Sequence, residues 1–336
     1  MSVEYLPWKY DHHRSSFFPN IQDVEDRLPS IVSLDVTLSP QTLVLIRHVL
    51  SERNMGNITA THPIDISVKP CIVKNIHIGE NCTPEEVTSC TTIFKEFRDV
   101  FAWSYEEMSG IDPSIIVHEI KTYLDAKPIC QKLQPVHPQK TAAIKAEIEK
   151  LLKAGFIYPV PLTEWVSNVI LVMKKQGTIR VCVDYQDLNL ACPKDNYPTP
   201  FIDQIIDNCA ESAIFSFIDG FFGYNQIKIL PLDQLKTTFI CPWGTFTYRK
   251  LPFGLKNVSA TFQRTMYYVF HDIKQIMDPY LDDLPAHSDR REEHLAHLRA
   301  IFLRCRHYRI RLNPHKCVFC VKSVRLLGFI VSRDGI

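Results

Sequence analysis

The second half of the chain alternates between helical and extended hydrophobic patterns. In KTAAIKAEIEKLLKAGFI (140–157), apolar residues recur at the spacing of one helix face, at Ile144, Ile148, Leu151 and Leu152. Gly155 follows, and glycine is a typical residue for ending a helix. The same spacing predicts further helices within 201–210, 257–273 and 291–310.

Short β-branched or alternating runs lie between these helices and predict strands. Two pairs are expected to form hairpins, one around Gly177 and one around Trp243-Gly244. The predicted strands lie within 165–175, 177–185, 214–221, 224–230, 237–255, 279–284 and 324–332. Because helices interleave with antiparallel strands, the pattern favours an α+β domain over a doubly wound parallel sheet.

The patterns divide the chain into three parts. Residues 1–60 hold short apolar runs and no chemical motif, so they form a poorly defined N-terminal segment. Residues 61–135 are rich in Pro, Thr and Cys and contain one predicted helix near 84–100, which suggests a linker with local order. Residues 136–336 hold the regular alternation and are expected to form the folded domain.

Three acidic residues stand at the edges of apolar strands: Asp219, Asp282 and Asp283. Buried like charges are costly unless they are paired or bind a cation. Neighbours on a strand face opposite ways, so a tight hairpin at the Asp282-Asp283 pair would let Asp282 face Asp219. Two divalent cations held there would suit an in-line phosphoryl transfer. Surface turn acids are the alternative, since a pair of adjacent aspartates is common.

Composition changes this picture little. The 336 residues are 46% hydrophobic, which is ample for a core, and the net charge is only +1. The total hides a stretch from His294 to Arg325 with eight Lys/Arg and no Asp/Glu. Such a stretch is either a solvated face or a surface that binds a polyanion.

The eleven cysteines are scattered, with neither a secretory signal nor an apolar run that could span a membrane. This favours reduced thiols in an intracellular protein. Cys317 and Cys320 form one CxxC beside His315, but no second pair completes a zinc site. A buried strand is the better interpretation of CVFCV.

Five motifs in order give a specific resemblance: RVCVDYQDLNLACPKDNYPTP, FSFIDGFFGYNQI, LPFGLKNVSATFQR, YLDD and LNPHKCVFCVKSVRLLGFIVS. From about residue 95 onward the chain resembles reverse transcriptases of Ty3/gypsy-type LTR retrotransposons, especially plant elements. The resemblance implies the fingers and palm of a right-hand polymerase, with an antiparallel palm sheet. Thumb and RNase H segments are not seen, so we expect little processive synthesis from this chain alone.

The resemblance also implies roles for single residues. Asp219 and Asp282 map to the metal ligands and Asp283 to an assisting acid, with two Mg²⁺ ions, or Mn²⁺, as cofactors. The nucleotide-binding positions map to Lys174 or Lys175, Arg180, Tyr224, Pro252, Phe253 and Gly254. Tyr224 would exclude ribonucleotides. The primer-grip turn maps to Leu327 and Gly328.

The implied activity is RNA-directed DNA polymerisation, with an RNA or DNA template, a primer and deoxynucleoside triphosphates as partners. No membrane is expected, the location would be a cytoplasmic particle or the nucleus, and the oligomeric state stays open. Pro279, Pro285 and Phe222 depart from the family pattern. They favour a rival hypothesis, an inactive remnant that only binds nucleic acid. A different two-metal phosphotransferase or nuclease would not explain LPFG and LLGF.

Overall fold

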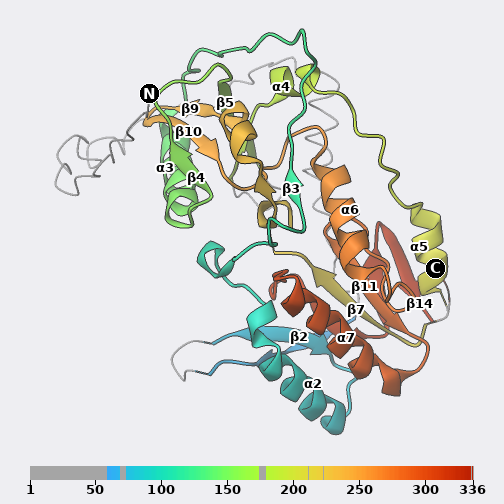
Figure 1. Cartoon of the computed structure of the whole chain (residues 1–336). Helices are drawn as coiled ribbons and strands as arrows, with labels where there is room; N and C mark the ends of the chain where they lie inside the picture. The colour runs from blue at the N-terminus through green and yellow to red at the C-terminus, as the bar shows by residue number, and fades with distance from the viewer. Residues whose placement is uncertain are drawn as a thin grey trace, which may run out of the picture. The chain divides into compact units, whose positions relative to one another are not determined.

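The computed structural model describes residues 59–68, 73–173, 179–210, 212–221, 223–333 and 335. All of these lie in one compact unit, and two five-stranded sheets form its framework (Figure 1). The first sheet has the order β1-β2-β12-β7-β11, and its strands are Thr61–Asp65, Asn75–Gly79, Val318–Val321, Ile214–Asp219 and Asp283–Ser288. Its pairs are antiparallel except for the parallel pair of β2 and β12.

The second sheet has the order β4-β10-β9-β5-β6, with strands Ile157–Pro159, Gly244–Tyr248, Phe239–Cys241, Ser167–Met173 and Ile179–Val183. Both predicted hairpins are present here, as β5 with β6 and as β9 with β10. Two smaller pairs complete the strands: β3 (Val117–His118) with β8 (Lys228–Ile229), and β13 (Ser323–Leu326) with β14 (Phe329–Ser332).

Every α-helix among the described residues except α4 overlaps a range predicted to be helical. The helices are α2 (Pro84–Glu96), α3 (Pro138–Lys153), α4 (Gln186–Ala191), α5 (Ile202–Cys209), α6 (Val258–Phe270) and α7 (His294–His307), with short 3-10 turns η3 (Arg98–Val100), η4 (Tyr105–Glu107), η5 (Gly223–Gln226), η6 (Pro231–Thr237) and η7 (Arg291–Glu293). Gly155, just beyond α3, has φ 71°, which a glycine adopts without strain. No helix among the described residues is both long and apolar enough to cross a membrane.

A cluster of five phenylalanines joins the first sheet to its helices. The Phe302 ring of α7 lies 6.1 Å from Phe94, 5.7 Å from Phe97, 5.6 Å from Phe101 and 5.9 Å from Phe319, measured between ring centroids. All five rings are buried. The cluster therefore ties α2, η3 and α7 to β12 (Figure 1), across more than 200 residues of sequence.

Two stretches differ from the expectations. The strand predicted over 224–230 is reduced to the two residues of β8, because Gly223–Gln226 turn as the 3-10 helix η5. The linker interpretation of 61–135 does not account for β1 and β2, which extend the first sheet beside β12. A five-residue strand whose partner is 240 residues away leaves little trace in its local pattern. The preferred interpretation of CVFCV is confirmed, since Val318–Val321 is a fully buried strand.

Removal of the Phe302 side chain tests the importance of the aromatic cluster. We expect Phe302→Ala to lower the free energy of unfolding by about 3–5 kcal/mol, because the packed core cannot collapse around the missing ring. Leu303→Ala, on the same helix but 50% exposed, should cost less than about 1 kcal/mol. Urea denaturation of both variants measures the difference, and equal losses would contradict the assigned core.

Candidate active site

The two adjacent aspartates lie at a tight hairpin, as the sequence predicts. Tyr280 and Asp283 exchange backbone hydrogen bonds of 2.9 and 3.0 Å, so Leu281 and Asp282 form the two-residue turn between them. Leu281 has φ 53°, a left-handed conformation that costs a non-glycine residue energy. Asp283 begins β11 directly opposite Asp219 on β7. The chain thus brings all three acids to one end of the first sheet.

A buried glutamine on α6 holds this turn. Gln263 is fully buried, its amide Nε2 donates to the carbonyl of Pro279 at 2.7 Å, and its Oε1 accepts from the backbone N–H of Leu281 at 2.7 Å. One side chain therefore satisfies a backbone acceptor and a backbone donor on either side of Tyr280. We infer that these bonds stabilise the left-handed turn that presents Asp282.

A cavity of about 260 Å³ lies at the acids, and both Asp219 and Asp282 line it. Asp282 packs over Gly223 so closely that a Cβ added to Gly223 would lie 2.1 Å from its Oδ1 and 2.8 Å from the ring of Phe262. Only a glycine at position 223 leaves room for this placement of the carboxylate. Asn313 and Lys316, from the loop before β12, line the same cavity.

Burial dominates the electrostatics of Asp219. Its side chain is almost fully buried, and this raises the pKa of its carboxyl from 3.8 to about 6. The Lys316 ammonium, 3.3 Å from Oδ2, opposes the rise, and the charge of Asp283 adds to it. At pH 7 the ionised carboxylate therefore destabilises the fold by on the order of 2–3 kcal/mol, and this cost is absent below the unfolded-state pKa. A bound cation would offset it.

The donor set fits magnesium when a substrate supplies further oxygens. No group of three or more His, Cys, Asp or Glu side chains in the described part of the chain is arranged to hold a metal ion alone. Mg²⁺ usually binds through one or two carboxylates together with substrate phosphates and waters, and it prefers oxygen ligands. Asp219 and Asp282 in one cavity supply that number of carboxylates.

Part of the predicted nucleotide pocket lines the same cavity. Pro252 and Phe253 line it, and Tyr224 packs behind Phe253 with 4.9 Å between ring centroids. Tyr224 is buried, and burial followed by the charge of Asp282 raises the pKa of its hydroxyl. Gly254 has φ 101° and is not part of the cavity lining.

Two asparagines outside the predicted set fix the loop that carries Phe253. The Nδ2 of Asn189 donates to the carbonyl of Gly254 at 2.7 Å, and its Oδ1 accepts from the N–H of Lys256 at 2.7 Å. Asn225 donates to the carbonyl of Leu251 at 3.1 Å. These bonds bracket the loop on both sides of Phe253.

The remaining predicted residues lie elsewhere. Lys174 and Lys175 fall outside the described residues, and Arg180 is described only by its backbone, which pairs with Val172 in β6. Leu327 and Gly328 form the turn between β13 and β14, with φ 53° and 101°. Leu327 packs in a separate apolar cluster with residues of α5 and β7. Their roles as fingertip and primer-grip residues stay predictions.

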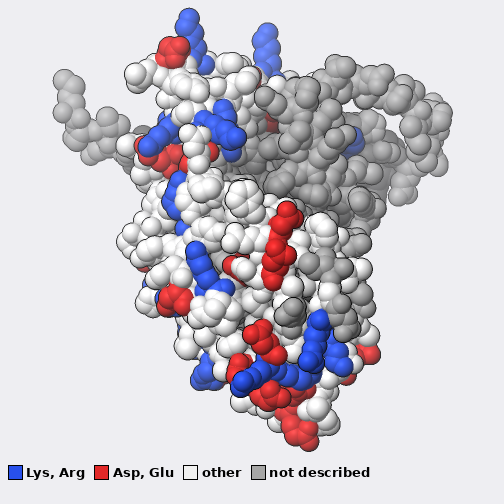
Figure 2. Space-filling view, turned by 90° about the vertical axis from the view of Figure 1, so that its right-hand side faces the viewer, with Lys and Arg blue, Asp and Glu red and all other residues white. Residues whose placement is uncertain are grey.

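Among the described residues, four of the eight Lys/Arg of the basic stretch 294–325 form ion pairs with acids. Arg299 pairs with Glu96 at 2.6 Å, Arg306 with Asp99 at 2.5 Å, and Arg304 with Asp272. Figure 2 shows basic and acidic side chains intermingled at the lower end of the visible face. This arrangement favours a solvated, ion-paired surface for α7 over a one-sign surface for nucleic acid.

Sequence reasoning missed Gln263, Gly223 and the two loop asparagines. Gln263 had a readable signal, because it is an amide among the buried residues of α6, between Phe262 and Met266. A buried amide requires hydrogen-bond partners, so such a residue indicates a specific contact. The asparagines had no comparable signal, since they lie in the short helical segments α4 and η5 and their bonds reach a loop 65 and 26 positions away.

Comparisons with known proteins agree with this geometry. The family model described as reverse transcriptase (RNA-dependent DNA polymerase) matches residues 172–331. The Tf2-3 and Tf2-7 transposon polyproteins of Schizosaccharomyces pombe (strain 972 / ATCC 24843) are each 29% identical over 244 residues, covering 72% of this chain and 18% of the polyprotein. The chain thus spans about a fifth of the length of these curated relatives.

Solved structures share the fold. The foamy viral protease-reverse transcriptase dRH in complex with double-stranded DNA aligns with a TM-score of 0.70 at 19% identity, over 92% of this chain and 49% of that one. The native prototype foamy virus protease-reverse transcriptase aligns with a TM-score of 0.68 at 22% identity, over 75% and 33%.

These matches indicate the class of protein that the chain resembles: residues 172–331 are similar to the reverse transcriptase family. The similarity to the Tf2 transposon polyproteins agrees with the predicted resemblance to LTR retrotransposons of the Ty3/gypsy type. The predicted α+β fold with fingers and palm is confirmed. The closer likeness to plant elements stays a prediction.

The space above Gly223 gives a first test of the site. We expect Gly223→Ala to reduce nucleotide incorporation strongly, because the new methyl group must displace the Asp282 carboxylate. Gly220→Ala is the matched control, since its Cβ would meet the nearest atom at 3.6 Å, an ordinary contact. Single-turnover incorporation measures both variants. Equal rates would contradict the placement of Asp282.

The glutamine clamp gives a second test. Gln263→Leu keeps the helix but leaves the Pro279 carbonyl and the Leu281 N–H without their partner, at a cost of about 1–3 kcal/mol each. We expect the maximal rate of incorporation to fall more than stability alone explains, because Asp282 loses its fixed turn. Gln131→Leu removes a comparable set of amide bonds to Asp187 and Asn168, far from the hairpin. If both variants lose equal activity at equal stability, Gln263 has no positioning role.

Proposed function

We propose that this chain catalyses template-directed transfer of deoxynucleotides onto a primer 3′-hydroxyl, as an RNA-directed DNA polymerase. One observation carries the proposal: Asp219, at the end of β7, and Asp282, in the turn before β11, line one cavity together with Pro252 and Phe253. Acids that can hold cations and apolar side chains that can contact a base suit a nucleoside triphosphate. The match of residues 172–331 to the reverse transcriptase model supports the same activity.

Asp219 and Asp282 would hold two Mg²⁺ ions, with Asp283 assisting from its position opposite Asp219. When bound, such ions stabilise both the attacking and the leaving oxygen of an in-line displacement. Lys316, 3.3 Å from Asp219, balances part of the negative charge before substrate binds. Gln263 and Gly223 would act indirectly, by fixing where the Asp282 carboxylate lies.

The nucleotide would lie on Phe253, which a T-shaped contact with Tyr224 holds in place. Tyr224 would limit the space beside the sugar and so favour deoxynucleotides. Arg180 and Lys174 or Lys175 would contact the triphosphate as fork and point charges. Leu327 and Gly328 would support the primer end.

A primed RNA or DNA template would be the nucleic-acid partner. The foamy viral structures with double-stranded DNA and with an RNA/DNA hybrid support this proposal by their likeness of fold. Since the arginines of α7 are paired with acids, we expect duplex contacts to come mainly from other elements. Backbone contacts of this kind weaken with salt.

The rival hypothesis, an inactive remnant, rests on Pro279 and Pro285. Both prolines are accommodated in the structure. The carbonyl of Pro279 accepts the bond from Gln263, and β11 keeps its register with β7 without interruption from Asp283 to Ser288. β11 is the terminal strand of its sheet, the position where proline is tolerated. The hairpin geometry therefore favours the enzyme.

Incorporation of one labelled deoxynucleotide onto a DNA primer paired with an RNA template tests the proposal. We expect Mg²⁺-dependent incorporation that falls by on the order of 10²–10³-fold in Asp219→Asn and in Asp282→Asn, because each removes a charge that stabilises the transition state. Asp203→Asn, an exposed acid on α5, is the control and should keep the full rate. Duplex binding without any incorporation would establish the remnant instead.

A further inference from the structure

Three cysteine side chains, Cys82, Cys90 and Cys320, meet between α2 and the first sheet and form a thiol cluster. Cys90 is on the buried face of α2, and its Sγ lies 3.6 Å from the Sγ of Cys320 on β12. Cys82 is in the connection between β2 and α2, and its Sγ lies 3.6 Å from the carbonyl oxygen of Cys320. Since Cys82 and Cys320 are 238 positions apart, only the folded chain brings these thiols together.

A bulge in β12 turns Cys320 towards the other two thiols. The register of β12 against β7 shifts between Val318 and Val321, and Cys320 has φ 57°. In a regular strand, Phe319 and Cys320 would face opposite sides. Here both belong to the core cluster that contains Cys90, whereas Val318 and Val321 pack in a separate cluster. The bulge therefore re-aims the Cys320 side chain towards α2, as bulges do.

Cys82 is the member of the thiol cluster that a reagent can reach. It is partly exposed, whereas Cys90 and Cys320 are buried. A side-chain hydrogen bond with Cys320 lowers the pKa of the Cys82 thiol, burial opposes this effect, and the charge of Arg291 adds to it. The thiolate is the nucleophile, and reactive cysteines are partly exposed and lie beside a cation. Cys82 has both properties.

Arg291 is held beside Cys82 by contacts with the start of α2. Its Nε donates to Oε1 of Glu86 at 2.5 Å, and its Nη2 donates at 2.9 Å to the carbonyl of Asn81, the residue before Cys82. Glu86 opposes part of the effect of Arg291, yet the pKa of the Cys82 thiol stays below its usual value. The folded chain thus keeps a positive charge next to its accessible thiol.

We propose that the thiol cluster is a site of reversible oxidation by hydrogen peroxide, which links Cys82 to Cys320 as a disulfide. The Cys82 thiolate sulfur attacks one peroxide oxygen, the O–O bond breaks, and the hydroxide that leaves takes up a proton as water. Cys82 is then a sulfenic acid. The Cys320 sulfur attacks the Cys82 sulfur, the S–O bond breaks, and the leaving hydroxide takes the Cys320 proton as water. Two thiols are oxidised by two electrons, and the peroxide is reduced to two waters.

Peptide mapping by mass spectrometry tests the proposal on the full, reduced chain after treatment with hydrogen peroxide. We expect a cross-linked pair of peptides that contain Cys82 and Cys320, and we expect dithiothreitol to separate them. Cys130, which is exposed and outside the thiol cluster, is the comparison in the same sample and should be modified more slowly. Modification of Cys130 before Cys82, or the absence of a link between Cys82 and Cys320, would overturn the proposal.

Two cysteine variants separate the two steps. Cys320→Ser should leave Cys82 as a sulfenic acid, which dimedone present during the treatment traps as an adduct. Cys90→Ser removes a thiol that takes no part in the link, so the yield of cross-linked peptide should not change. Failure of dimedone to label Cys82 in folded Cys320→Ser would overturn the proposed order of steps. If either variant fails to fold, the mapping of the unaltered protein still decides.

Arg291→Met tests the cation. Without the guanidinium the pKa of the Cys82 thiol rises, so the rate of cross-linking should fall several-fold at pH 7 and its pH profile should move to higher pH. Arg290→Met is the matched control, because the exposed Arg290 pairs with Glu293 at 3.5 Å. Identical profiles for the two variants would overturn the proposed activation of Cys82. The result is independent of whether the chain polymerises DNA.

Discussion

The rest of this structure depends on one constraint: the carboxylates of Asp219, Asp282 and Asp283 are held at one end of a sheet, where little solvent reaches them. Asp219 ends a strand that is buried along its whole length, and burial raises the pKa of its carboxyl to about 6. Every specific contact around it limits that cost or fixes its neighbours: Lys316 supplies a counter-charge, Gln263 holds the turn before Asp283, and Gly223 makes room for Asp282. The buried, ionised carboxylate lowers the stability of the folded chain alone. A cation that bound the native state would offset this loss of stability.

The sheet that carries these acids is assembled from distant parts of the chain. β7 and β12 form its buried centre, β2 and β1 extend one side, and β11 closes the other. Helix α7 packs against β11 and also against α2 through the phenylalanine cluster, and its arginines pair with Glu96 and Asp99 near the end of α2. Exposed pairs of this kind contribute at most about 1 kcal/mol each. They also neutralise part of the positive charge that the sequence shows in the stretch 294–325.

The sequence predicts those features whose causes are local. The helix over 138–153, both hairpins and the turn at Asp282 follow from hydrophobic period and turn chemistry, and each is present. Features with distant causes were missed. β1 and β2 depend on β12, and the 3-10 turn at Gly223–Gln226 depends on packing of Tyr224 against Phe253 and Phe262, which an alternating pattern cannot reveal. The three acids could be identified from the family motif. The residues that fix their positions could not, because they act through contacts between distant positions, such as that of Gln263 with Leu281, 18 positions away.

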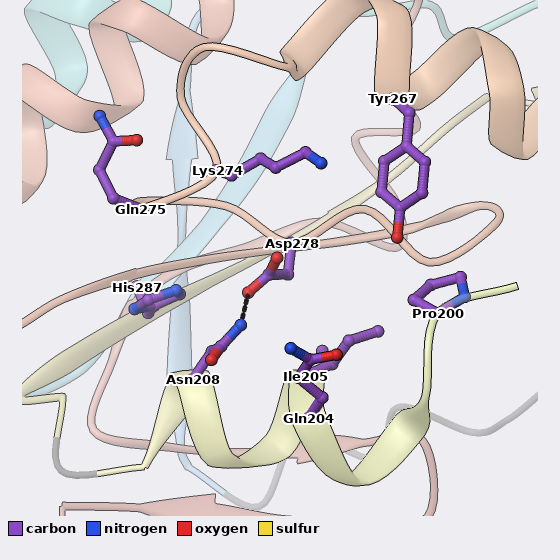
Figure 3. Close-up of a pocket in the computed structure, with 9 residues that line it drawn as sticks. All are labelled: Pro200, Gln204, Ile205, Asn208, Tyr267, Lys274, Gln275, Asp278 and His287. Atoms are coloured by element: carbon purple, nitrogen blue, oxygen red, sulfur yellow. Dashed lines mark hydrogen bonds between the residues drawn. The ribbon is translucent and has the colours of Figure 1, made fainter.

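Strand β11 runs from the hairpin that carries Asp282 to a cavity that His287 lines (Figure 3). Residues at alternate positions of a strand share a face, so Asp283, Pro285 and His287 point the same way while Leu284 and Ala286 face the core. Asp283 lies at the active-site end and His287 lines that cavity, with the ring of Pro285 between them. Proline fixes φ, so it removes backbone freedom at this position. Judged from the family motif alone, Pro285 would be expected to disturb the hairpin. In the structure it lies on the terminal strand of the sheet, in an uninterrupted register with β7. Its fixed φ therefore stiffens the segment between Asp283 and His287.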